Sequence, residues 1–259
     1  MYYWAVIGDL ARSRRIRRRD EFQRRLETLM DHANRRFAAG LVSRWVITTG
    51  DEFQALYADP EGMVEAVHFL CEEIWPQRVR FGIGYGELAT ALKAQAVGMD
   101  GPAFHAARAA LEEAKKGRHL VRVALAPPGG GAYPIAAAAS DVWDLVAKVV
   151  QGRHRSEQEV ARSYRELGKQ VAVARNLGIS QGAVSKSLSR GLYSEARRVI
   201  RHLPGLLRDS TSPPGAEGPP APRVPGPPTA ARPASAWPSS SAWRAGRCLR
   251  DAPWRRGAQ

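Results

Sequence analysis

Residues 45–57 read WVITTGDEFQALY, and this stretch decides how the rest of the chain is interpreted. Its first five positions are apolar or β-branched, apolar residues return from Phe53, and Gly50, Asp51 and Glu52 lie between the two runs. Two strand-like runs joined by Gly-Asp predict a tight β-hairpin. The tip of this hairpin would carry two adjacent carboxylates.

Predicted strands and helices alternate on both sides of the hairpin. An apolar run at 2–8 predicts a strand, and apolar residues at three- and four-residue spacing predict a helix over 20–37 with Asp20 as its N-cap. Downstream, the same criteria predict a helix at 61–74, a strand at 78–86, a helix at 102–114 and a strand at 120–126. The order β-α-β-β-α-β-α-β predicts an α/β fold, an α+β ferredoxin-like sheet backed by helices.

Composition divides the chain of 259 residues further. Most of its 18 prolines follow residue 207, in a segment rich in Pro, Ala, Ser and Arg without apolar periodicity, so 205–259 is predicted to be a disordered tail. A formal net charge of +14 indicates either a polyanionic partner or a generally basic proteome, and the charge alone does not decide between them. Two cysteines form neither a disulfide framework nor a metal-ligand cluster. No long apolar run and no secretory signal pattern is present, which predicts a cytoplasmic protein with no membrane partner.

Two Gly-Asp dipeptides end predicted strands, at Asp9 in AVIGD and at Asp51 in ITTGD. If the hairpin pairs beside the first strand, both carboxylates reach one edge of the sheet. Neighbouring carboxylates repel one another unless a hard cation neutralises them, and Mg²⁺ binds one or two carboxylates together with a substrate phosphate. The pair therefore predicts a metal–nucleotide site with Mg²⁺ as its cofactor. The alternative is that Asp9 caps the following loop and Asp51 serves the turn.

A basic loop, ARSRRIRRRDEFQ, follows the first strand. Ser13, Arg14 and Arg19 lie between a strand end and a helix N-terminus, where donors and the helix dipole favour an anion, so we expect them to bind phosphate. The alternative is a solvated arginine run, the interpretation we adopt for Arg15, Arg17 and Arg18.

Four segments in order, YYWAVIGDLARSR, ITTGDEFQALY, VRFGIGYGEL and AVGMDGPAFHAARAAL, resemble the core blocks of the class III nucleotidyl cyclase and GGDEF superfamily. More closely, Gly8-Asp9, Ser13-Arg14, Arg19 and Gln23 followed by GDEFQ resemble the SatD family. The resemblance covers residues 1–126. It implies a nucleotidyl cyclase-like sheet with Asp9 and Asp51 as metal ligands. We expect Arg108 to face a phosphate, because a guanidinium offers a planar fork of donors. Glu52 either joins the two aspartates in binding the ligand or bonds within the turn.

The chain also departs from the cyclase pattern. Cyclases usually have a lysine shortly before the hairpin Gly-Asp and an Asn four residues before the later Arg, whereas here Arg44 and Phe104 occupy those neighbourhoods. A second Gly before Gly50 is absent. These departures favour binding over cyclisation, and catalytic residues stay unassigned. The alternatives are a divergent nucleotidyl cyclase or phosphotransferase tethered to DNA, and an empty scaffold for dimerisation.

A second module follows a predicted connecting helix. The stretch QVAVARNLGISQGAVSKSLSRG predicts a helix-turn-helix, because Gly178 suits a sharp turn, Ser180 can cap the second helix, and Val184 and Leu188 form its inner side. The stretch resembles sigma-factor region 4. The resulting recognition helix would read DNA with Ser180, Gln181, Ser185, Lys186, Ser187 and Arg190. The alternative is a helical hairpin used for packing or dimerisation.

The predicted organisation has four parts. A SatD/nucleotidyl cyclase-like α/β domain spans 1–126, a linker and connecting helix span 127–155, a helix-turn-helix domain spans 156–204, and the tail spans 205–259. Together they indicate a transcriptional regulator that responds to a nucleotide or other phosphorylated small molecule. We expect a homodimer, because helix-turn-helix proteins commonly bind paired half-sites.

Overall fold

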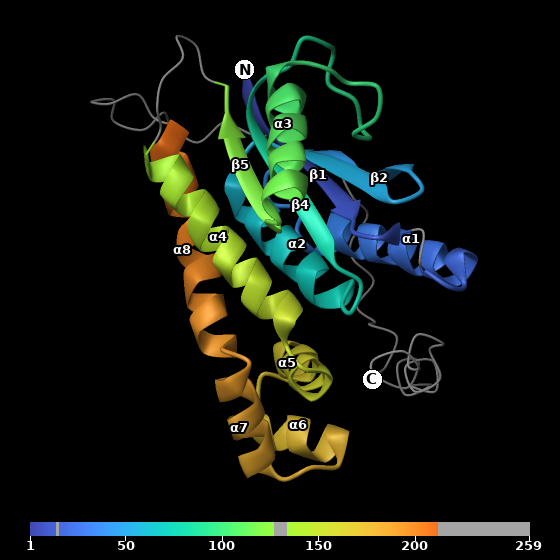
Figure 1. The fold of residues 1–259 in the computed structure, drawn as a ribbon, viewed down its shortest axis with the longest axis vertical. Coiled ribbons are helices and arrows are strands. Elements are labelled where there is room, and N and C mark those ends of the chain that lie inside the picture. Colours follow the sequence, from blue (N-terminus) through green and yellow to red (C-terminus); the bar gives the residue numbers. More distant parts are fainter. Residues whose placement is uncertain (14–15, 127–133, 212–259) are drawn as a thin grey trace, which may run out of the picture.

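The computed structural model describes residues 1–13, 16–126 and 134–211, and Figure 1 shows their arrangement. A five-stranded sheet forms one end of the molecule and three short helices form the other. The described elements are, in order, β1 (Tyr2–Leu10), α1 (Arg19–Arg36), β2 (Leu41–Thr49), β3 (Glu52–Tyr57), α2 (Pro60–Glu73), β4 (Val79–Glu87), α3 (Pro102–Gly117), β5 (Val121–Leu125), α4 (Pro134–Gly152), α5 (Arg155–Leu167), α6 (Gln170–Leu177), α7 (Gln181–Arg190) and α8 (Tyr193–Thr211).

The strand order in the sheet is β2-β3-β1-β4-β5. Neighbouring strands are antiparallel except β4 and β5, which are parallel. The predicted hairpin is present as β2 and β3, and β3 pairs beside β1, the arrangement that brings both Gly-Asp dipeptides to one end of these strands. The chain therefore has a mixed α/β fold with a five-stranded sheet, followed by helices.

Alternate residues of β1 face two different cores, as expected for a strand buried on both sides. Trp4 and Val6 join a cluster that includes residues of α1 and α2, while Ala5 and Ile7 join a smaller cluster with α3. On β4, a Cβ at Gly84 would collide with the backbone of α3. Glycine at this position therefore lets α3 approach the sheet closely.

The start of α1 differs from its prediction. The helix begins at Arg19, and its N-cap residue is Arg18 with a left-handed φ of 30° and no side-chain cap hydrogen bond. Asp20 is therefore not the cap. It lies in the first turn of α1, where a carboxylate interacts favourably with the helix dipole.

Helices α4 and α8 belong to the core beneath the sheet. Trp143 and Val150 of α4, and Ile200 and Leu203 of α8, are buried in the same cluster as Trp4. Figure 1 shows the two helices side by side along one flank of the molecule. Helix α8 continues to Thr211, so residues 205–211 are helical, which corrects the predicted start of the tail at 205. The remainder of the predicted tail, 212–259, lies outside the described residues.

The other three C-terminal helices, α5, α6 and α7, share a separate small core. Val160 of α5, Val173 of α6 and Val184 of α7 are buried together, with Tyr193 from the start of α8.

Among the helices of the described ranges, none is long and apolar enough to cross a membrane.

Candidate functional site

The two Gly-Asp dipeptides lie at the same end of the paired strands β1 and β3. Asp9 at the end of β1 lies opposite Glu52 in the β1–β3 register, and the Leu10 amide donates to the Asp51 carbonyl at 3.0 Å. Partial burial raises the pKa of Asp9, and the negative charge of Asp51 raises it further, although Lys115 and Arg80 oppose these effects. The structure thus brings Asp9 and Asp51 into electrostatic contact.

Two residues of the basic loop contact the hairpin tip. The hydroxyl of Ser13, which is buried, donates to Asp51 Oδ2 at 2.5 Å. The Arg19 guanidinium lies against Gly50, since a Cβ there would be 2.6 Å from Arg19 Nη2. Both residues therefore flank the carboxylate pair from the side of α1. Arg14, the third expected phosphate-binding residue, lies outside the described residues.

Sequence reasoning missed two cations beside Asp9. Lys115 Nζ, from the last turn of α3, lies 3.6 Å from Asp9 Oδ1, and Arg80 Nη1 of β4 lies 3.8 Å from Oδ2. Arg80 is the cross-strand partner of Asp9 in the β1–β4 register. Pairing the predicted strand 78–86 with the first strand would have placed Arg80 beside Asp9. Lys115 could not have been found in this way, because it comes from the end of a helix that no local pattern aligns with β1.

Glu52 and Arg108, both expected to bind ligand, bind each other. Arg108 Nη2 donates to Glu52 Oε1 at 2.7 Å, and Nη1 donates to Oε2 of the same carboxylate. The hydrogen bonds to Glu52 are the main cause of a raised pKa for Arg108. A phosphate would have to displace Glu52 to reach the fork of donors on Arg108.

The residues at this edge fit a hard divalent cation that also contacts a ligand. In the described part of the chain, no group of three or more His, Cys, Asp or Glu side chains is arranged to hold a metal ion. Mg²⁺ requires only one or two protein carboxylates when ligand phosphates and waters supply the other oxygens. Asp9 and Asp51 provide two such carboxylates. The pKa of Asp9 is raised mainly by burial and further by the charge of Asp51, and a bound cation would favour its ionised form.

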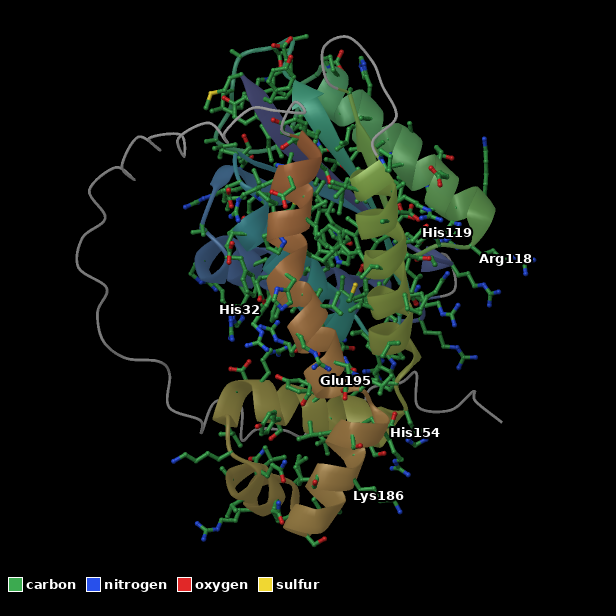
Figure 2. All side chains as sticks on the ribbon, turned by 90° about the vertical axis from the view of Figure 1, so that its left-hand side faces the viewer. His32, Arg118, His119, His154, Lys186 and Glu195 are labelled. Carbon is green, nitrogen blue, oxygen red and sulfur yellow. The ribbon has the colours of Figure 1, made fainter. Side chains whose placement is uncertain are left out.

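Helices α6 and α7 are joined by a tight turn at the end of the molecule away from the sheet. Gly178 has a left-handed φ of 67°, and the Ser180 hydroxyl accepts a hydrogen bond from the Ala183 amide at 3.1 Å. Val184 and Leu188 are buried, as expected for the inner side of α7. Figure 2 shows Lys186 at this end of the molecule.

The expected DNA-binding residues of α7 are not equally accessible. Ser187 is only 5% exposed, so it cannot contact DNA as expected and packs with the inner side of α7. Gln181 is exposed and donates to Gln170 Oε1 at 2.5 Å. Arg190 Nε lies 3.5 Å from Glu157 Oε1 with its side chain 58% exposed. Ser180, Ser185 and Lys186 are exposed as well.

A buried ion-pair cluster joins the sheet-bearing part to α5, and no sequence pattern indicated it. Glu72, near the end of α2, is fully buried and accepts hydrogen bonds from Arg153 Nη1 at 2.8 Å and Arg165 Nη1 at 2.6 Å. Gln158 donates to the Glu72 carbonyl at 2.7 Å, and Arg162 also binds that carbonyl. The C-terminus of α2 is therefore held by side chains from α5 and the segment before it.

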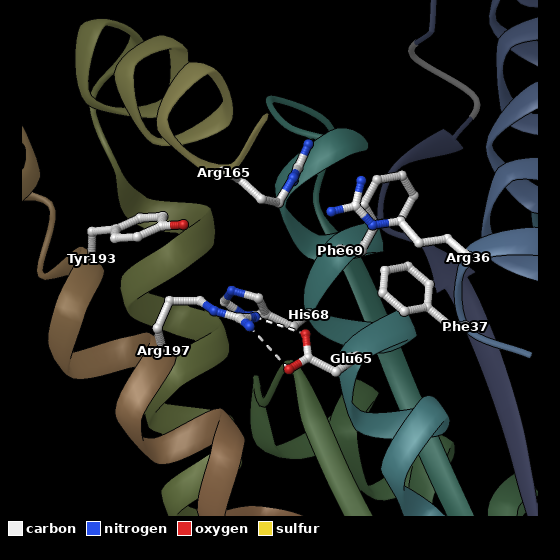
Figure 3. Close-up of a pocket in the computed structure, with 8 residues that line it drawn as sticks. All are labelled: Arg36, Phe37, Glu65, His68, Phe69, Arg165, Tyr193 and Arg197. Atoms are coloured by element: carbon white, nitrogen blue, oxygen red, sulfur yellow. Dashed lines mark hydrogen bonds and ion pairs between the residues drawn. The ribbon is translucent and has the colours of Figure 1, made fainter. Parts of the chain in front are cut away.

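A cavity of about 190 Å³ lies beside this cluster, between α1, α2, α5 and α8. Figure 3 shows its eight lining residues, with Arg197 of α8 paired to Glu65 of α2 at 2.7 Å and 3.0 Å. Arg165 is paired with Glu72, and Arg36 lies 3.4 Å from Glu166. Each of these arginines is paired with an acidic residue of another helix, so the residues that line the cavity hold the helices together.

Comparison with known proteins identifies the first half of the chain. Residues 3–126, slightly less than half of the chain, match the family model described as the SatD family. No curated protein matches the chain. The match ends before α4, and the similarity of α6 and α7 to sigma-factor region 4 stays a prediction.

Two solved structures, both of a bacterial light-regulated adenylyl cyclase, have a weak similarity to the chain. One has a TM-score of 0.36 and 9% identity, over 47% of this chain and 74% of that chain. The other has a TM-score of 0.37 and 11% identity, over 48% of this chain and 43% of that chain. At this distance the similarity carries no conclusion about activity.

Proposed function

We propose that this chain is a SatD-like DNA-binding regulator whose α/β domain, a ferredoxin-like and cyclase-like sheet, binds a Mg²⁺-nucleotide or related phosphorylated ligand. The observation that carries the proposal is the meeting of Asp9 and Asp51 at one sheet edge, flanked by Ser13 and Arg19. Two carboxylates beside hydroxyl and guanidinium donors match the needs of a cation and of the phosphate that it contacts.

Each residue at the edge has a distinct part in this proposal. Asp9 and Asp51 hold the cation, which supplies positive charge for ligand phosphate oxygens. Ser13 orients the Asp51 carboxylate through its hydrogen bond. Arg19, at the first position of α1, offers donors beside the positive end of the helix dipole. Lys115 and Arg80 offset part of the charge of Asp9 when no cation is bound.

The DNA-binding half of the proposal uses the exposed side of α7. Gln181 and Ser185 present polar groups suited to base edges, and Lys186 and Arg190 present cations suited to phosphates. Helices α5 and α6 support α7 through their shared core. This division between a buried side and an exposed polar side is the one that a recognition helix requires.

Helix α2 connects the two halves. It follows the hairpin strand β3 directly and carries Glu72 in its last turn, where Arg153 and Arg165 bind the carboxylate from the helical side. A shift of α2 on ligand binding would therefore move α5 and the helices packed on it. The ligand can change DNA affinity only if it binds more tightly to one position of α2 than to the other.

The test of the ligand site is a calorimetric titration of the full chain with ATP, GTP and cyclic dinucleotides in Mg²⁺. Asp9→Asn and Asp51→Asn should each weaken binding by on the order of tenfold or more, about 1.4 kcal/mol per factor of ten. Asp31→Asn, at an exposed carboxylate on α1, is the matched control and should bind like the wild type. No binding by the wild type sinks the ligand proposal.

The same mixtures distinguish a regulator from an enzyme. Analysis by chromatography should show unchanged nucleotide, because Arg108 is occupied by Glu52 and the cyclase pattern is incomplete. Product that disappears in Asp51→Asn would instead establish a cyclase or phosphotransferase. DNA binding is tested separately by fluorescence anisotropy with fragments of the source genome, with Lys186→Ala and Arg190→Ala as variants.

A further inference from the structure

An apolar stripe is exposed along the outer side of α4. Its residues follow one another at intervals of three, four, three and four, the spacing of a heptad seam. Ile135 is 48% exposed, Val142 39% and Leu145 62%. The opposite side of the helix is buried in the core through residues such as Trp143 and Val150. The complete stripe consists of Ile135, Ala138, Val142, Leu145 and Val149.

Helix α8 extends the apolar surface. Arg197 and Arg208 pair with acidic residues of α2 or of the turn before it, so they mark the side of α8 that faces α2. Val199 and Leu206 each lie two residues away, about 200° around the helix, on the side away from α2. Leu206 is 40% exposed and Val199 is half-buried. Figures 1 and 2 show α4 and α8 adjacent along the same surface.

The residue types in the stripe favour a particular partner. Ile135, Val142 and Val149 occupy one heptad position, and Ala138 and Leu145 occupy the other. β-branched residues at the first position with leucine at the second favour two parallel helices in a coiled-coil pair. We propose that α4 pairs with α4 of a second copy of this chain, in parallel about a two-fold axis, with Val199 and Leu206 at the border of the interface.

The charges beside the stripe are compatible with burial. Asp141 and Lys148 flank it, and each already has a partner within the chain: Arg122 Nη1 lies 2.5 Å from Asp141 Oδ1, and Asp144 Oδ2 lies 2.7 Å from Lys148 Nζ. A second α4 therefore covers apolar side chains without leaving a charge unpaired, which is the costly outcome at an interface.

The parallel orientation is also the one that suits two DNA half-sites. A two-fold axis along α4 places the α6–α7 ends of both copies at the same end of the dimer, whereas antiparallel helices would place them at opposite ends. Paired recognition helices on one duplex require the first arrangement. This argument for orientation rests on the proposed DNA binding, but the seam itself does not.

Sedimentation equilibrium of the full chain without DNA tests the seam. The wild type should be a dimer at micromolar concentration, and Val142→Glu/Leu145→Glu should raise the dimer dissociation constant at least 100-fold. Leu92→Glu, at an equally exposed leucine in a loop after β4, is the control and should remain dimeric. Circular dichroism establishes that each variant is folded. A monomeric wild type, or a folded double variant that stays dimeric, overturns the proposal.

A cysteine cross-link tests the orientation. In a Cys248→Ser background, Ile135→Cys should form an intermolecular disulfide, because equivalent positions face each other across a parallel two-fold axis. An antiparallel pair would separate them by about 25 Å. A dimer that the double variant disrupts but Ile135→Cys does not cross-link overturns the parallel arrangement. Because neither measurement uses DNA, a cross-linked dimer that binds no DNA in the anisotropy assay supports the seam and overturns only the proposed function.

Discussion

Asp9 lies directly opposite Glu52 across β1 and β3, although 42 residues separate them along the chain. This register brings the residue before Glu52, Asp51, to the end of β1, where its carbonyl accepts from Leu10. Glu52 is held by two hydrogen bonds from Arg108, whereas Asp9 has only the longer ion pairs with Lys115 and Arg80, at 3.6 Å and 3.8 Å. The register thus determines which carboxylates are available to a cation.

The charge of Asp9 should reduce stability when no ligand is bound. Its folded-state pKa is raised, so the folded protein binds the proton more tightly and loses stability as the pH rises above the ordinary value of 3.8. Asp9→Asn should therefore equal or exceed the wild type in melting temperature at pH 7, with the difference vanishing below pH 3.8. Asp31→Asn on the exposed side of α1 is the control, within about 0.5 kcal/mol of the wild type. A clear loss of stability in Asp9→Asn would contradict this account.

Glu72 should be one of the most sensitive positions for stability. Glu72→Gln leaves Arg153, which is buried, without its counter-ion, and breaking a buried ion pair costs about 3 kcal/mol or more. Urea denaturation followed by circular dichroism measures this loss. The exposed Glu112→Gln should cost less than about 1 kcal/mol, because the Glu112 side chain is 50% exposed and its ion pair with Lys115 lies at the surface. Equal losses in the two variants would mean that the buried ion pairs of Glu72 contribute no more stability than an exposed ion pair.

Acid should destabilise the protein through the same cluster. His68 of α2 is buried with its Nε2 atom 3.6 Å from Glu72 Oε1. Burial lowers the pKa of His68 to about 4, so stability falls between pH 6.5 and 4 as the unfolded chain gains the proton. Burial raises the pKa of Glu72, but His68, Arg165 and Arg153 outweigh it and lower the value to about 2. Because His68 is neutral above pH 4, only Arg165 and Arg153 stabilise the charged Glu72 carboxylate at neutral pH. The stability that Glu72 contributes is lost between pH 4.5 and 2.

Thermal melts from pH 7 to 3 measure this acid sensitivity. The wild type should lose melting temperature continuously across the range. Glu72→Gln should have a flatter profile below pH 4.5, since it lacks the carboxylate that titrates there. Parallel profiles for the two proteins would exclude Glu72 as the source.

Gly84 should not tolerate a side chain. A Cβ at this position would collide with the backbone of Ala103 and Ala107, neither of which can rotate away. Overpacking of this kind costs about 1–3 kcal/mol, so Gly84→Ala should lower the free energy of unfolding by that amount. Gly152→Ala is the control, because a Cβ there meets nothing within 4 Å. A neutral Gly84→Ala would indicate that α3 can move away from the sheet.

Lys186→Ala should weaken DNA binding uniformly across sequences. A lysine that neutralises one phosphate contributes about one counter-ion, so the variant should lower the slope of log affinity against log salt by about 1. Lys116→Ala on α3 is the matched control and should leave the slope unchanged. Ser187→Ala should also leave DNA affinity unchanged, because Ser187 is buried. Equal effects of Lys186→Ala and Lys116→Ala would locate the DNA contact elsewhere.

Local sequence signals determined the elements of this protein. The Gly-Asp turn between two apolar runs fixed the hairpin, and three- and four-residue spacing identified α2 and α3 close to their observed bounds. These features depend on backbone preferences within a few residues, which the sequence states directly. The α6–α7 turn, with Gly178 and Ser180, was predictable for the same reason.

The tertiary structure alone decided which of these elements share a core and which charges meet. Trp143 and Ile200 look like residues of a linker and a second domain, yet they are buried beneath the sheet, because the apolar sides of α4 and α8 cover each other and α2. Ser187 looks exposed by its polarity but is buried by its place on α7. Glu52 turns to Arg108, and Asp9 gains Lys115, through contacts between distant segments. Such pairings follow from packing and charge at long range, which no local pattern specifies.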